Sequence, residues 1–333
     1  MLSTSVLLVI VVFLALAFDF INGFHDTANA IATSVSTRAL TPRRAIIMAA
    51  ILNFVGALYS TGVAKTIASD IVNAKIVTAE VMIGALIGAI AWNLLTWYFG
   101  IPSSSSHAII GGVMGAGAAK AGFGALKLAG LQKIIAALVF SPIIGYALGF
   151  VLMTILYWMF GRVSPSKINH GFRKMQILSA GLLAFNHGSN DAQKSMGIIT
   201  LALVAAGAQT SVEVPLWVKI ACATAMAIGT ASGGWKIIRT MGAKIFKIEP
   251  INGFASDLSS SIVIWTATVA SGLHLPVSTT HVVSGSIMGV GSAKRLSAVR
   301  WGVAQQMLVA WLLTIPFTAL VGALSYKIVA WIL

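Results

Sequence analysis

The chain has 333 residues, of which 58% are hydrophobic and only 9% are charged, whereas soluble domains carry about 25% charged residues. Several apolar runs approach the roughly 20 residues that span a bilayer, so this composition excludes a soluble globular protein and predicts an all-α polytopic membrane protein. The net charge of +14 is typical of basic cytoplasmic loops, with an attractive field for anions as a second contribution, and its spread over several loops argues against nucleic-acid binding.

The first apolar segment, residues 2–37, is too long for one simple span. As a helix it would reach roughly 54 Å, against a hydrocarbon core of about 30 Å. A polar cluster around Asp26 interrupts it, so we expect a helix that is broken at membrane depth and lines a cavity. The arginine-rich loop 37–44 is expected in the cytoplasm, and residues 45–63 are expected to cross back.

The next segment, residues 78–120, is expected to form a re-entrant hairpin. An apolar arm leads to a tip that starts at Pro102, and a glycine-rich arm returns. Residues 134–160 then cross to the cytoplasm, where the basic stretch 161–175 forms a linker between two halves of the chain.

The second half repeats this plan. Residues 176–207 are again overlong and interrupted by polar side chains, now around Asp191. The remaining expected elements are a span at 215–234, a basic cytoplasmic loop at 236–247, a second hairpin at 257–294 and a last span at 301–333.

The two hairpin tips share one sequence pattern. Residues Pro102 to Lys120 and Pro276 to Lys294 align without a gap and are identical at 9 of 19 positions. Each copy places a proline and a run of hydroxyl side chains before an apolar segment. Ser and Thr cap helix N-termini, where free N–H groups and the helix dipole attract anions. The pair therefore predicts two anion-binding tips, as in a transporter of a small oxyanion.

The spans predict an inverted repeat. Each half has three crossings and one hairpin, and because three is odd the halves should have opposite orientations. The tips would then enter from opposite faces and meet near the midplane, as in secondary transporters. We expect a first transmembrane repeat at residues 1–160, the linker at 161–175 and a second, inverted repeat at 176–333.

The two polar interruptions also align with each other. With Asp26 placed on Asp191, Asn29 falls on Lys194. Ionisable residues within a membrane are costly and usually functional, although Lys194 could simply pair with Asp191. A carboxylate does not attract an oxyanion, so we expect it to hold a coupling cation. Carboxylate and amide oxygens suit Na⁺ at Asp26 and Asn29, whereas Lys194 supplies a charge that a metal would otherwise bring and thereby favours proton coupling.

Several other polar residues are open to two interpretations. His25 and His187 border the aspartates and are either proton relays or structural. His107 and His281 follow the tips and are either caps or proton-sensitive ligands. Asp257, near the start of the second hairpin, is expected to cap it at the membrane interface.

No pattern in the chain favours an enzyme. The serine runs lack the G-x-S-x-G elbow of a hydrolase, and no G-x-x-x-x-G-K-[ST] loop predicts ATP binding. We therefore expect no enzymatic activity and no cofactor.

Four segments of the chain resemble the motifs of a known family. The segments FDFINGFHDTANAIAT and AFNHGSNDAQKSMG, together with IPSSSSH and LPVSTTH, resemble the inorganic phosphate transporter (PiT) family over nearly the whole chain. The resemblance implies phosphate bound near the midplane between broken helices and hairpin tips. Two departures stand out: Phe24-His25-Asp26 replaces Ala-Asn-Asp, and Lys194 replaces an Asn of sodium-coupled members, which resembles the bacterial proton-coupled branch.

The sequence thus predicts a secondary transporter that imports inorganic phosphate by cation symport, with H⁺ favoured over Na⁺. The residues expected at the substrate site are Ser103, Ser104, Ser105, Ser106, Ser278, Thr279, Thr280, Asn29, Asn190 and Lys194. Those expected to carry the cation or proton are Asp26, Asp191, Asn29, His25 and His187. Alternatives are a sulfate permease, a sodium symporter, an anion channel and a membrane enzyme.

The expected partners follow from the same interpretation. They are phosphate, free or as a metal–phosphate complex, the coupling ion and the lipid bilayer, with a homodimer as one oligomeric state. The expected location is a bacterial plasma membrane.

Overall fold

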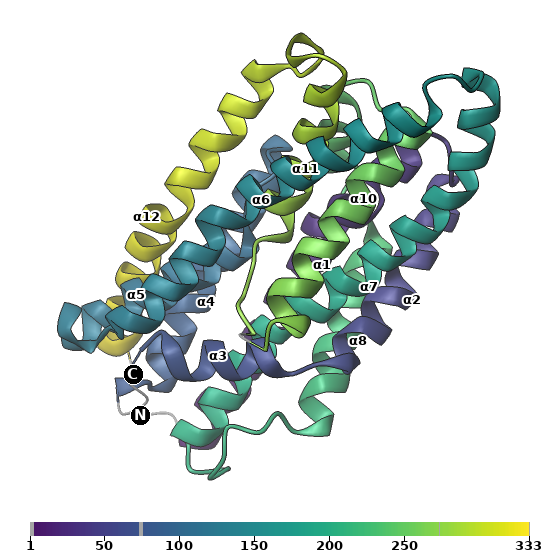
Figure 1. Cartoon of the computed structure of the whole chain (residues 1–333). Helices are drawn as coiled ribbons and strands as arrows, with labels where there is room; N and C mark the ends of the chain where they lie inside the picture. Colours follow the sequence, from purple (N-terminus) through teal and green to yellow (C-terminus); the bar gives the residue numbers. More distant parts are fainter. Residues whose placement is uncertain (1–2, 73–75, 273, 333) are drawn as a thin grey trace.

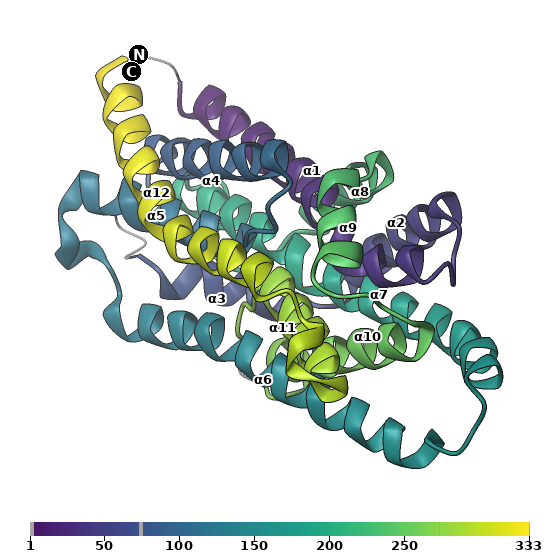
Figure 2. The ribbon, with the colours of Figure 1, turned by 90° about the horizontal axis from the view of Figure 1, so that it is seen from above.

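The computed structural model describes residues 3–72, 76–272 and 274–332. These residues form a single bundle of long helices joined by short loops (Figure 1). The first helix starts and the last helix ends at the same end of the bundle (Figures 1 and 2). The prediction of an all-α protein is confirmed.

Helices of similar length recur in the same order in the two halves. The first half contains α1 (Thr4–Ser36), α2 (Pro42–Tyr59), α3 (Gly62–Asp70), α4 (Ala79–Phe99), α5 (Ser105–Ala121) and α6 (Leu128–Phe160). The second half contains α7 (Pro165–Ala205), α8 (Leu216–Ser232), α9 (Trp235–Arg239), α10 (Pro250–Trp265), α11 (Thr279–Lys294) and α12 (Trp301–Ile332). Short π-helical turns extend α9 and α10. Most of the expected linker 161–175 is helical, because α7 begins at Pro165.

Within the described ranges, four helices are long and apolar enough to cross a membrane: α1, α4, α6 and α12. Two further pairs meet the same test but are bent, α2 with α3 by 65° and α8 with the α9 segment by 62°. Counting each bent pair as one span gives up to 6 crossings. The protein is therefore a multi-pass membrane protein, as the composition predicts.

The position of the broken helices was predicted wrongly. α1 and α7 run without interruption through Asp26 and Asp191, and the breaks fall between α2 and α3 and between α8 and α9. Neither polar cluster contains a proline, and its side chains bond mainly to other helices, so the backbone ladder of α1 and α7 stays intact. At the second break, Gly233 has a φ of 73°, which glycine adopts without strain.

Matched glycines bring helices of opposite halves into close contact. A Cβ atom at Gly23 of α1 would lie 2.4 Å from the carbonyl oxygen of Met226 in α8. One at Gly188 of α7 would lie 2.2 Å from that of Asn53 in α2. Each long central helix therefore packs on the second helix of the other half.

The hairpin tips lie inside the bundle. The first tip follows Gly100, and α5 begins at Ser105; the second follows the extension of α10, and α11 begins at Thr279. The tip residues 103–106 and 277–280 are all buried. From neighbouring starts, α5 and α11 run to opposite ends of the bundle, with α5 beside α12 and α11 beside α6 (Figures 1 and 2).

The close contact at Gly188 leads to a test of the packing. In Gly188→Ala the added methyl group must push α7 away from α2, so we expect a loss of about 1–3 kcal/mol of stability. Thermal unfolding of the purified protein in detergent would measure it. Gly171→Ala is the matched control, because it lies on the same helix with nothing within 4 Å of its Cβ position. Equal melting temperatures for the two variants would contradict the assignment.

Candidate functional site

Polar side chains from four helices meet in the middle of the bundle. They come from the central turns of α1 and α7 and from the first turns of α5 and α11. α1 and α7 are antiparallel here, since Asn22 contacts Asp191 while Thr37, further along α1, contacts the earlier Gln176. The predicted site residues are all buried, each exposing 6% or less of its surface.

Asp191 is the most heavily bonded carboxylate of this cluster. Its Oδ2 lies 2.8 Å from the Lys194 ammonium, and the same oxygen accepts a 3.3 Å hydrogen bond from Asn22. Its Oδ1 accepts a 2.7 Å bond from Asn190. The ring Nε2 of His187 lies 3.7 Å from Oδ2. Asp191 and Lys194 are one turn apart on α7, so the ion pair forms within a single helix face.

Asp26 has no lysine beside it and is bonded differently. Its Oδ1 lies 2.6 Å from Nδ1 of His25, whose other ring nitrogen is 3.0 Å from the Thr96 hydroxyl. Its Oδ2 accepts a 3.1 Å bond from Ser105, and Oδ1 accepts a 3.4 Å bond from Thr280. Both hairpin tips therefore donate to this one carboxylate.

The hydroxyl groups of the tips link the two aspartates. Ser105 is in reach of both carboxylates, at 3.1 Å from Asp26 and 3.4 Å from Asp191, and also accepts a 3.1 Å bond from Lys194. Asn29 donates to Thr279 at 3.2 Å and to Thr280 at 2.9 Å. The four chain segments are thus joined by one continuous network of charge-assisted hydrogen bonds.

The predicted capping by hydroxyl groups is confirmed at both tips. Ser104 accepts a hydrogen bond from the backbone N–H of His107 at 3.1 Å, and Ser278 accepts one from His281 at 3.2 Å. These caps start α5 and α11 next to the aspartates, so the positive ends of two helix dipoles face the carboxylates. The rings of His107 and His281 lie 4.5 Å apart behind the tips.

Two of the predicted tip residues, Ser103 and Ser106, bond to groups other than the carboxylates. Ser103 bonds to Thr96, and Ser106 donates to the backbone carbonyl of Val277. The side-chain amide of Asn190, which donates to Asp191, also donates to the Val277 carbonyl, at 3.0 Å. These bonds hold the tips against each other and against α4.

A cation could be held at the centre of the network. Ligand atoms of Asp26, His187 and Asp191 all lie within 4.8 Å of one another. The buried amide oxygen of Asn29 has no hydrogen-bond partner among the described residues. Oxygen-rich sets of this kind suit hard cations. Helix α7 therefore adds His187 and Asp191 to the predicted pair of Asp26 and Asn29. Spacing along α1 alone could not indicate these two residues.

Sequence reasoning missed some members of the network. Asn22 belongs to the polar cluster around Asp26, but the sequence does not indicate its contact with Asp191. Asn53 bonds to His187 at 3.1 Å, and its only signal in the sequence is that it is a single amide in an apolar span. The expectation that Asp257 caps the interface is wrong. α10 begins at Pro250 with Glu249 as its cap, so Asp257 lies two turns inside the helix and is fully buried.

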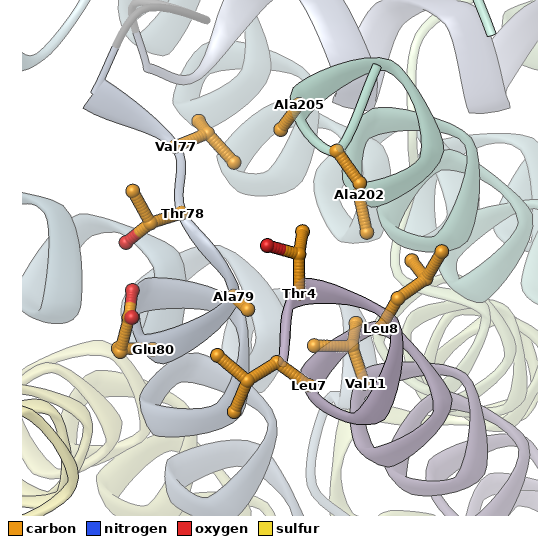
Figure 3. Close-up of a pocket in the computed structure, with 11 residues that line it drawn as sticks. Thr4, Leu7, Leu8, Val11, Val77, Thr78, Ala79, Glu80, Ala202 and Ala205 are labelled. Carbon is orange, nitrogen blue, oxygen red and sulfur yellow. The ribbon is translucent and has the colours of Figure 1, made fainter. Parts of the chain in front are cut away.

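A cavity of about 210 Å³ lies apart from this network, at the end of the bundle where α1 and α4 begin. Figure 3 shows Thr78 and Glu80 on one wall, with Ala202 and Ala205 of α7 on another. No predicted site residue lines it. Its polar side chains are Thr4, Thr78 and the acidic Glu80, and no basic side chain is among its described lining residues, so it lacks the positive charge that would attract an anion.

A helical membrane protein whose ionisable side chains converge where two buried hairpin tips meet has the architecture of a solute transporter. The comparisons with known proteins agree. The chain belongs to the Phosphate transporter family, whose sequence profile matches residues 22–322.

Similar proteins are known from bacteria. A protein of Bacillus subtilis (strain 168), named "Probable low-affinity inorganic phosphate transporter", is 56% identical over 97% of both chains. One of the same name from Rhizobium meliloti (strain 1021) is 49% identical over 96% of both. A solved structure entitled "The sodium-dependent phosphate transporter" superposes with a TM-score of 0.91 at 27% identity, covering 98% of this chain and 100% of that one.

The buried ion pair of Asp191 and Lys194 leads to a stability test. Lys194→Met leaves the Asp191 carboxylate without its cation, so we expect a loss of about 3–5 kcal/mol, and Lys194→Met with Asp191→Asn should recover much of it. Thermal unfolding in detergent would measure both. The control is Lys65→Met, which breaks the exposed 2.6 Å pair with Glu213, whose pKa is lowered by the hydrogen bond from Lys65. We expect Lys65→Met to change the stability only slightly. A similar loss of stability in Lys65→Met and Lys194→Met would contradict the expectation.

Proposed function

We propose that this protein imports inorganic phosphate across a bacterial plasma membrane by proton symport. The observation that carries the proposal is the Lys194 ammonium, 2.8 Å from Asp191 and 3.1 Å from Ser105 of the first tip. It places a fixed positive charge at the point where the two tips and both aspartates meet. Membership in the Phosphate transporter family supports phosphate as the substrate.

Phosphate would bind between the two tips. The hydroxyl groups of Ser105, Thr279 and Thr280, the N-termini of α5 and α11, and Lys194 are all donors, as an oxyanion requires. The amides of Asn29 and Asn190 complete the set. Ser103, Ser104, Ser106 and Ser278 would act by holding the tips in place. On binding, the tip hydroxyl groups that now donate to the aspartates would donate to the phosphate oxygens instead.

The coupling protons would be carried by the aspartates. Two carboxylates beside a phosphate dianion repel it, so binding requires added positive charge. Lys194 provides part of that charge, and protonation of Asp26 or Asp191, with His25 and His187 as relays, would provide the rest. Proton coupling then follows from electrostatics, since the site binds phosphate best when it also binds protons.

Sodium coupling is the second candidate. The superposed structure is entitled as a sodium-dependent transporter, and the atoms of Asp26, His187 and Asp191 lie close enough to hold a cation. In this chain Lys194 would compete with a metal for Asp191, which favours the proton.

Alternating access would use the two halves as moving units. We propose two inverted repeats, residues 1–160 and 176–333, joined by 161–175. The recurring order of helices and the opposite directions of α5 and α11 support this division. The bends between α2 and α3 and between α8 and α9 are natural hinges.

Coupling can be tested in proteoliposomes with radiolabelled phosphate. We expect an inward proton gradient to drive uptake and an inward Na⁺ gradient to drive none. Lys194→Asn should gain a dependence on Na⁺, because an amide oxygen replaces the competing ammonium. Lys120→Asn is the control, since Lys120 lies at the far end of α5 and bonds to Thr78.

Two outcomes would contradict this reading. Uptake by the wild type under a Na⁺ gradient alone would show that Lys194 does not replace a metal and would favour the sodium symporter. Accumulation of sulfate, with no phosphate uptake under either gradient, would move the assignment to a sulfate permease.

Selectivity for phosphate over sulfate follows from the carboxylates. A protonated phosphate oxygen can donate to Asp26, whereas sulfate leaves that acceptor unpaired, at a cost of about 1.5–3 kcal/mol or roughly ten- to a hundredfold in binding. Competition of unlabelled sulfate against labelled phosphate would measure the ratio. We expect Asp26→Asn to reduce this ratio of phosphate binding to sulfate binding. If unlabelled sulfate and unlabelled phosphate compete equally well in the wild type, Asp26 is not the source of selectivity.

A further inference from the structure

A further buried carboxyl group, on α10, lies outside the central network. Asp257 of α10 is fully buried, and its two oxygens face α1 and α7. Oδ1 accepts a 2.7 Å hydrogen bond from Thr33, and Oδ2 lies 3.4 Å from the hydroxyl of Ser179.

Within the described part of the chain, no basic side chain forms an ion pair with Asp257. α10 packs against α1, α6, α7 and α11. Among the described residues, none of the titratable groups on these helices is hydrogen-bonded to Asp257, whose hydrogen-bond partners are Thr33 and Ser179. These titratable groups are Asp19, His25 and Asp26 on α1, Lys133, Tyr146 and Tyr157 on α6, Lys167, His170, Arg173, Lys174, His187, Asp191 and Lys194 on α7, and His281 and Lys294 on α11. A charged carboxylate in this setting would be uncompensated, which is costly in a protein interior and more so at membrane depth.

The hydrogen bonds fit a protonated carboxyl group. The Ser179 hydroxyl also lies 3.2 Å from the backbone carbonyl of Gln176 and can donate its proton there. Its oxygen is then free to accept a hydrogen bond from a proton on Oδ2 of Asp257, while Oδ1 accepts from Thr33. With this arrangement every polar atom of the carboxyl group has a partner, and no charge is buried.

Asp257 lies between the central network and the basic end of the bundle. Thr33 follows Asp26 by seven residues on α1, which places it about 10 Å further along the helix. The next contact on the same seam, Thr37 with Gln176 at 2.7 Å, adjoins the arginine-rich loop that follows α1. On this part of α7 and α10, the side-chain oxygens of Asn186, Ser256 and Ser261 are buried and have no hydrogen-bond partner in the described ranges. The seam is therefore polar from the centre to that end.

We propose that Asp257 is a proton-binding site through which the coupling proton passes between the central aspartates and the basic, cytoplasmic end. The step is a proton transfer only. The protonated Asp257 first releases its proton to water at the cytoplasmic end and becomes a carboxylate, which then accepts a proton from the central side and returns to the protonated state. The inference rests on the proposed proton symport for its role, but the presence of the proton can be tested without transport.

Infrared spectroscopy of the purified protein in lipid nanodiscs tests the proton directly. At neutral pH we expect a C=O stretching band of a protonated carboxyl group that is lost in Asp257→Asn. Asp70→Asn, at a partly exposed aspartate that accepts a bond from Ser69, should leave the band unchanged. If Asp257→Asn removes no such band, the proposal is wrong whatever the coupling ion is.

Transport assays test the role of that proton. Asn has the size and hydrogen bonds of the protonated acid, so Asp257→Asn should still exchange internal for external phosphate without a gradient. Accumulation driven by a proton gradient should fall to the level seen without one, and Asp257→Glu should restore it. Accumulation that persists in Asp257→Asn would overturn the role, whereas failure of wild-type uptake under a proton gradient would overturn the proposed symport instead.

A further variant covers the case in which Asp257→Asn does not assemble. Thr33→Val keeps the carboxyl group but removes its shortest hydrogen bond, which should shift the same infrared band to higher frequency. An unshifted band would show that the protonated group is not Asp257 and would overturn the proposal.

Discussion

The buried carboxylates of Asp26 and Asp191 are the constraint on which the rest of the structure depends. Ionised groups inside a low-dielectric bundle must be matched by donors and positive charge. The match comes from Lys194 on the same helix as Asp191, from amides on α1 and α7, and from the capped starts of α5 and α11. This need for compensation explains why two hairpins end in the middle of the molecule rather than at its surface.

Close packing between the halves keeps this network in place. α1 rests on α8 and α7 on α2 at glycine contacts, while α5 lies beside α12 and α11 beside α6. No half forms its share of the site alone, because each aspartate is bonded by hydroxyl groups from both hairpins. Movement of one half against the other would therefore change the bonding of both carboxylates at once, which is the coupling that alternating access needs.

The carboxyl groups divide into two kinds by their surroundings. Asp191 has a lysine and two amides, as a charged group requires, whereas Asp257 has only neutral hydroxyl groups. Environments that differ in this way separate groups that hold charge from groups that hold protons. Both kinds contact α1 and α7, so the proposed substrate site and the proposed proton path would share these two helices.

The sequence by itself determined the multi-pass class, the repeated tips, the capping serines and the aspartates of the candidate site, because apolar runs, hydroxyl caps and ionisable residues in apolar segments each have a local signature. It misplaced the helix breaks, since polar clusters look like interruptions until their partners on other helices are known. It also missed Asn22 and Asn53 and misread Asp257, because a lone polar residue does not reveal what it faces. Only the tertiary structure decided those partners, since hydrogen bonds between residues more than a hundred positions apart depend on how the helices pack and not on any spacing along the chain.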